Sequence, residues 1–120
     1  MAEVRKFGGL ILFFIEDNKI KTFSGKWLYI IDGRNLREFS GVIRYTYDGE
    51  LIRDFYGRML YFFDGKTFKE FSGVIRYTFD GESIKDFYGR YLYTIRGRLS
   101  SYEIAFLITL LHTGELDKYM

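Results

Sequence analysis

Apolar and polar residues alternate in short runs along residues 2–97, and a glycine or a turn residue interrupts the runs every eight residues. The pattern has a period of sixteen residues, as the segments 50–65, 66–81 and 82–97 show most clearly. Six copies begin at residues 2, 18, 34, 50, 66 and 82, and their positions are numbered 1 to 16 below. Each copy of such a repeat must bury itself against its neighbours. We therefore expect a single domain over residues 1–120, with six repeats in 2–97 and a separate C-terminal segment in 98–120.

The repeat predicts β-hairpins. Position 8 is Gly in all six copies, and position 16 is Gly in five, with Asp17 in the first. The runs between them are rich in β-branched and aromatic residues, which favour strands. Glycine at this spacing is typical of two-residue hairpin turns, which need a positive φ. The sequence thus predicts an antiparallel up-and-down meander of about 10–12 short strands.

Two-residue turns would place positions 3, 5, 10, 12 and 14 of each copy on one face of the sheet. Positions 3, 10, 12 and 14 are apolar in every copy, so this face is predicted to be buried. Its central pairs join an aliphatic or aromatic residue at position 3 to an aromatic residue at position 12, for example Ile52 with Tyr61. The same register turns Trp27, at position 10, toward the interior.

The opposite face is predicted to be basic and aromatic. Position 4 is always basic: Arg5, Lys21, Arg37, Arg53, Lys69 and Lys85. Position 6 is always Phe, and Phe23, Phe39, Phe55 and Phe71 are its candidate binding residues. In this register the face carries a single acid, Glu3, so the net charge of +2 conceals a one-sided distribution.

The C-terminal segment predicts one α-helix. Ser100 and Glu103 form a capping-box pattern, and Gly114 is suited to end the helix. The residues between them are apolar in nearly every direction, so the helix must be buried on all sides. We expect a barrel-like roll around the helix, with an open single-layer sheet that dimerises as the alternative.

A twelve-stranded barrel around an apolar C-terminal helix resembles the plan of the tubby and scramblase-like domains, whose chains are much longer. The Tyr-x-Gly and Asp-Gly hairpins also resemble MORN repeats, which have a different spacing. No motif of either family matches here, so neither resemblance implies a function or a role for any residue.

The residues do not indicate catalysis, because each candidate recurs in other copies. The only histidine, His112, lies at the end of the predicted helix, where a cation suits the helix dipole. Asp32, Asp48, Asp64 and Asp80 precede glycines, and turn chemistry accounts for them. The chain has no cysteine. We therefore expect no enzyme, no cofactor and no metal site.

The expected function is a non-catalytic binding or scaffolding module, with a protein-interaction or structural role favoured and self-association possible. The first alternative is a polyanion-binding platform, for nucleic acid or anionic lipid, on the basic–aromatic face. The second is carbohydrate binding by exposed aromatic residues. No apolar run is long enough to span a membrane. Residues 1–7 do not resemble a secretion signal, so the expected location is the cytoplasm.

Overall fold

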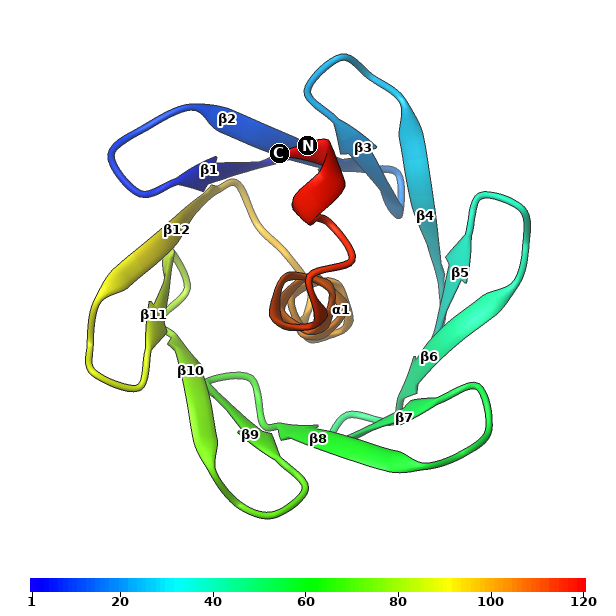
Figure 1. Ribbon diagram of the computed structural model, residues 1–120. Coiled ribbons are helices and arrows are strands. Elements are labelled where there is room, and N and C mark those ends of the chain that lie inside the picture. The colour runs from blue at the N-terminus through cyan, green and yellow to red at the C-terminus, as the bar shows by residue number, and fades with distance from the viewer.

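The computed structural model describes residues 1–120 and is a closed barrel of twelve antiparallel strands around one helix (Figure 1). Each strand pairs with its neighbours in sequence, and β1 closes the barrel on β12. The strands are β1 (Ala2–Lys6), β2 (Ile11–Glu16), β3 (Lys19–Thr22), β4 (Trp27–Asp32), β5 (Asn35–Glu38), β6 (Ile43–Tyr47), β7 (Leu51–Asp54), β8 (Met59–Phe63), β9 (Thr67–Glu70), β10 (Ile75–Phe79), β11 (Ser83–Asp86) and β12 (Tyr91–Arg96). The predicted barrel is confirmed, and the open-sheet alternative is wrong because the sheet has no free edge.

The helix α1 (Ser101–Thr113) follows the strands and runs through the centre of the barrel (Figure 1). The expected capping box is present: the Ser100 side chain accepts a hydrogen bond from the Glu103 amide, and the Glu103 side chain accepts one from the Ser100 amide. Gly114 ends the helix with a φ of 80°. A short 3-10 helix, η1 (Asp117–Tyr119), completes the chain.

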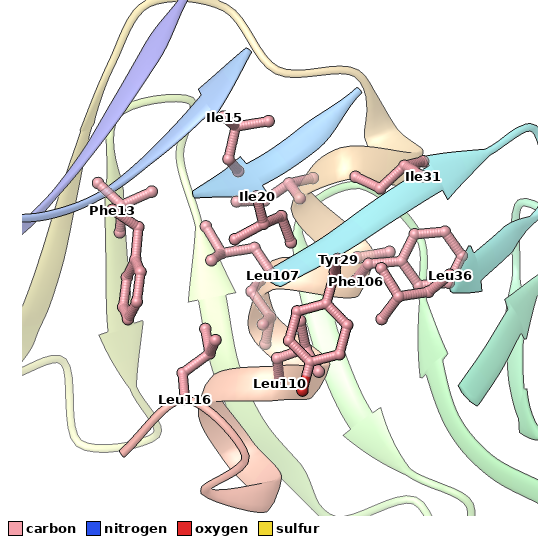
Figure 2. Packing of buried hydrophobic residues seen from close by; sticks show 14 of the residues in the cluster. Phe13, Ile15, Ile20, Tyr29, Ile31, Leu36, Phe106, Leu107, Leu110 and Leu116 are labelled. Atoms are coloured by element: carbon pink, nitrogen blue, oxygen red, sulfur yellow. The ribbon is translucent and has the colours of Figure 1, made fainter. Parts of the chain in front are cut away.

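The core lies between the helix and the inner face of the wall. Residues 104–110 of α1 are all buried, as a helix apolar on every side requires. All six residues at position 3 are at most 1% exposed. Figure 2 shows Phe106, Leu107 and Leu110 of α1 among wall residues such as Ile20 and Leu36. One central helix thus serves as the common core of six hairpins.

The loops at one end of the barrel are the predicted two-residue turns. In the turn between β10 and β11, the Asp80 amide donates to the Ser83 carbonyl, and Gly81 has a φ of 99°. No atom outside the turn lies within 4 Å of a Cβ built on Gly81, so backbone conformation alone demands glycine here. The first copy meets the same demand with Asp17 and Asn18, both at positive φ.

The loops at the other end have three residues, and there the prediction is wrong. Between β9 and β10 the Glu70 amide donates to the Val74 carbonyl, and the Gly73 amide donates to the Glu70 carbonyl. A three-residue loop of this kind is a turn followed by a glycine at positive φ, and Gly73 has a φ of 97°. Each hairpin therefore holds one more loop residue than the sequence pattern indicated.

A β-bulge follows each three-residue loop and changes which residues face inward. In all six hairpins the register shifts so that position 4 pairs with position 10, as Lys69 does with Ile75. Position 10 therefore joins the outer face with position 4, and the prediction that it is buried is wrong. Trp27 is 42% exposed and lies outside, with the Lys19 amine 4.6 Å from its ring centre.

The hairpins flare outward at the three-residue loops, and Figure 1 shows them as six lobes around the helix. The end of α1 and the chain's tail lie at this same end. Arg44 bonds Glu115 there, and the Lys26 amine lies 5.6 Å from the centre of the Tyr119 ring. The barrel thus has a tight end, at the two-residue turns, and a flared end, at the three-residue loops. The flared end carries most of the chain's exposed large hydrophobic side chains.

Candidate functional site

The flared end carries a ring of exposed hydrophobic side chains, which we call the crown. Seventeen large hydrophobic residues of the chain are exposed, and all but Met1 and Met120 occupy positions 6 to 10 of a repeat. The crown consists of Phe7, Leu10, Phe23, Trp27, Phe39, Val42, Phe55, Tyr56, Met59, Phe71, Val74, Ile75, Phe87, Tyr88 and Tyr91. Such a concentration at one end is unusual, because soluble surfaces normally carry exposed apolar residues singly.

Aromatic pairs lie at four of the seams between neighbouring hairpins, including Phe14 with Phe23 at the β2/β3 seam, and three of these seams also have a backbone hydrogen bond from the phenylalanine at position 6. At the β12/β1 seam, Phe7 stacks on Tyr91 with ring centres 5.0 Å apart, and the Phe7 amide donates to the Leu92 carbonyl. The β4/β5 and β8/β9 seams have the same backbone bond. Their ring pairs are Trp27 with Phe39 and Phe62 with Phe71. At these three seams the backbone pairing between neighbouring strands continues almost to the loops.

Two other seams open into grooves, where the strand pairing ends sooner. The β10/β11 pairing stops at Tyr77 and Asp86, and the groove above it has a volume of about 740 Å³. The equivalent groove at the β6/β7 seam has about 460 Å³. Position 11 is Leu at the three closed seams, but it is Arg44 and Arg76 at these two. A long charged side chain thus replaces an apolar one at the two seams where the strand pairing ends sooner.

His112 lies in the larger groove. Its Nδ1 is 3.0 Å from the Tyr77 hydroxyl, and its Nε2 is 3.8 Å from a Glu70 oxygen. Burial lowers the pKa of His112 from its usual value, because the charged ring loses solvation, although the Glu70 charge acts in the opposite direction. The chain holds no group of three or more His, Cys, Asp or Glu side chains arranged to bind a metal ion.

The tail is fastened to the barrel through Glu115. Its Oε1 accepts hydrogen bonds from Arg44 and from the Tyr45 hydroxyl, the latter at 3.1 Å. Burial, with the nearby Glu115 charge, raises the pKa of Tyr29 to about 12 and raises that of Tyr45 further still. These contacts pin residues 112–119 inside the flared end, so the crown surrounds a filled centre.

The predicted basic row is present, but acidic side chains accompany it. Five of its six members make ion pairs: Arg5–Glu3, Lys21–Glu16, Arg37–Asp32, Arg53–Asp48 and Lys85–Asp80, at 2.8–3.7 Å. In four of these pairs the acid occupies position 15 and meets position 4 of the next copy across the two-residue turn. Lys69 alone has no ion pair. The face is therefore not one-sided in charge, and its role in binding stays a prediction.

The candidate phenylalanines lie beyond the strand ends, closer to the three-residue loops than the basic row does. Phe23, Phe39, Phe55 and Phe71 belong to the crown, at 48–64% exposure. The position-4 residues of copies 2 to 6 are half-buried along strands β3, β5, β7, β9 and β11. The predicted basic–aromatic face thus consists of a largely charge-paired row along the wall and an aromatic rim at the loops. The two meet where the Lys21 and Lys85 amines lie 5.6 and 4.5 Å from the ring centres of Trp27 and Tyr91.

The repeated aspartates serve the two-residue turns. One oxygen of Asp64 accepts hydrogen bonds from the amides of Lys66 and Thr67, at 2.9 and 2.8 Å. Asp48 and Asp80 make the equivalent bonds. These bonds lower the pKa of all three carboxyls, because they favour the charged form.

A second period in the sequence could have indicated the grooves. Residues 38–61 and 70–93 agree closely, so copies 3 and 4 match copies 5 and 6 as pairs over 32 residues. Each pair joins an Glu-Phe-Ser-Gly-Val loop to an Asp-Phe-Tyr-Gly-Arg loop, and each open seam lies between the two. Asp54 with Arg58 and Asp86 with Arg90 form ion pairs of 2.6 Å within the second kind of loop.

Comparison of the chain with protein-family models, with curated proteins and with solved structures gives no match. The single long helix, α1, is too short to cross a lipid bilayer.

Proposed function

We propose that the chain is a non-catalytic protein-interaction module and that the crown is its binding surface. The observation that carries this proposal is the gathering of fifteen exposed large hydrophobic side chains at one end of the barrel. The core does not need them, because α1 and the inner face of the wall already form it. Exposed apolar surface lowers solubility, and a partner surface that covers these side chains would gain hydrophobic free energy by removing them from water.

The crown is large enough for a specific interface. Its six phenylalanines are 48–64% exposed, and Tyr56 and Tyr88 are 82% and 81% exposed. With roughly 200 Å² for each aromatic side chain, these eight residues leave about 1,000 Å² in contact with water. A standard protein–protein interface buries about 800 Å² on each partner. Aromatic residues are also the side chains that most often dominate binding free energy.

Charge favours a protein partner over a polyanion. The six hairpin tips, positions 5 to 9 of each copy, have formal charges of +1, +1, −1, 0, −1 and 0 in chain order, so the rim is neutral. The basic row on the wall is largely paired with acids. A polyanion site would instead present unpaired cations, and its affinity would fall steeply with salt.

A crown variant with a matched control tests the proposal. The crown variant combines Phe39→Ser, Tyr56→Ser and Tyr88→Ser. The two tyrosines occupy position 7, where three other copies already have a serine: Ser24, Ser40 and Ser72. The control combines Ile30→Thr and Leu51→Ser, which copy Thr46 and Ser83 at equivalent positions away from the crown.

Each immobilised protein is incubated with an extract of the source organism at low and high salt. We expect wild type and control to retain the same proteins at both salt concentrations, and the crown variant to lose them. Equal retention by all three would contradict the proposal. Retention that salt abolishes, and that charge reversal at Arg37, Arg53 and Lys69 removes, would support the polyanion alternative instead.

A further inference from the structure

We infer that the crown binds a second copy of the same chain, rim to rim, with Lys26 of each copy facing Glu38 of the other. This inference rests on the proposed function, because it names the partner that the crown accepts. Two identical rings match in diameter, and a twofold axis across the barrel ends would make the interface self-complementary. The estimated 1,000 Å² of exposed aromatic surface would supply each half of such an interface.

The charges of the tips permit this arrangement. A rim-to-rim twofold reverses the order of the hairpins, so each tip of one copy meets a different tip of the other. If the axis passes between the second and third hairpins, the basic second tip faces the acidic third tip. In that register the first tip faces the fourth and the fifth faces the sixth, so no two tips of like charge meet.

Glu38 has the capacity for a second partner. Its contact with Arg44 is 3.8 Å long, and the same arginine also bonds Glu115. The other acidic tip residue, Glu70, is closer to its own arginine, Arg76, at 3.0 Å. Lys26 makes no ion pair within the chain. An added cation from a second copy would therefore serve Glu38 better than Glu70.

The seam beside the axis carries the aromatic pair Trp27 and Phe39. Their ring centres are 6.0 Å apart with the planes at 71°, and the side chains are 42% and 62% exposed. In sequence, Lys26 immediately precedes Trp27 and β4, and Glu38 is the last residue of β5, next to Phe39. A central aromatic cluster with charged residues at its margin is the usual anatomy of a specific interface.

Sedimentation velocity over a concentration series tests the inference on the full chain. We expect wild type and the Ile30→Thr/Leu51→Ser control to dimerise with the same affinity, and the crown variant to dimerise at least about tenfold more weakly. The chain's only tryptophan, Trp27, provides a second readout, because its emission should shift to the blue as dimers form. Circular dichroism verifies that every variant retains the wild-type fold.

Charge reversal tests the register. At low salt, Lys26→Glu should weaken the dimer by about tenfold, since it places two acids opposite each other at two symmetric sites, and Lys26→Gln should weaken it less. Adding Glu38→Lys to Lys26→Glu should restore most of the affinity. A wild-type monomer at millimolar concentration, a crown variant that dimerises normally, or a failure of Glu38→Lys to restore binding would each overturn the inference. If the purified chain is monomeric while the crown still retains extract proteins, the inference fails and the proposed function stands.

Discussion

The substitution Phe106→Ala tests whether the central helix is the core of the barrel. Phe106 has no exposed surface, and its ring centre lies 6.3 Å from that of Tyr47. Removing a fully buried phenylalanine loses its transfer free energy and leaves a cavity, which together cost about 3–5 kcal/mol. A domain of this size has a free energy of unfolding of about 5–15 kcal/mol. The change should thus remove a large part of the stability without abolishing the fold.

Urea unfolding measures the effect, with circular dichroism and Trp27 fluorescence as two probes of one transition. With a slope of about 2 kcal/mol/M, the midpoint should fall by about 2 M. Phe87→Ala is the matched control, because it removes the same ring from a site that is 62% exposed, and it should change the midpoint little. A loss below about 1 kcal/mol for Phe106→Ala, or equal effects of the two substitutions, would refute the central-helix core.

Three further outcomes follow from single features of the fold. The pKa of His112 is lowered in the folded state, so the unfolded chain binds more protons below about pH 6.5, and wild type should lose stability as the pH falls through that range. Urea unfolding at pH 7.5 and pH 5 measures this loss, which should be smaller for His112→Gln. A Cβ on Gly97 would lie 2.7 Å from the Met1 carbonyl oxygen at a φ of 98°, so Gly97→Ala should lower the thermal midpoint by several degrees. Tyr29 and Tyr47, whose pKa values burial raises to about 12, should ionise only above pH 11 in an absorbance titration, and ionisation near pH 10 would show that they are solvated.

The sixteen-residue period predicted the hairpins, and the separate signals in residues 98–120 predicted the helix and, through it, the barrel. Position 3 is buried in all six copies, and Ser100, Glu103 and Gly114 act as the helix signals indicated. These features depend on local chemistry: alternation defines a face, and capping residues define ends. An all-apolar helix then favoured a barrel interior over an open sheet, because the helix must be buried on all sides.

The register near the flared end could not be predicted, because the loop length was ambiguous. A two-residue turn and a three-residue loop both place glycine at positive φ at almost the same point in the sequence. The extra residue and the bulge that follows it move position 10 to the outer face, which is why Trp27 was assigned to the wrong side. The ion pairs of the basic row were missed for a different reason, since Asp32 and Arg37 are not direct cross-strand partners and meet only diagonally across a two-residue turn.

The phenylalanine at position 6 recurs in all six three-residue loops although the residues around it vary. Position 7 varies between Gly, Ser and Tyr, yet position 6 is Phe in every copy. The core does not explain this, because all six rings are at least 48% exposed. Stacking at the seams explains only some of them, since the rings within reach of Phe55 and Phe87 are their own loop neighbours, Tyr56 and Tyr88. Because seam stacking leaves Phe55 and Phe87 without a ring partner outside their own loops, the recurrence of this exposed ring in all six copies is best accounted for by a partner that packs against it.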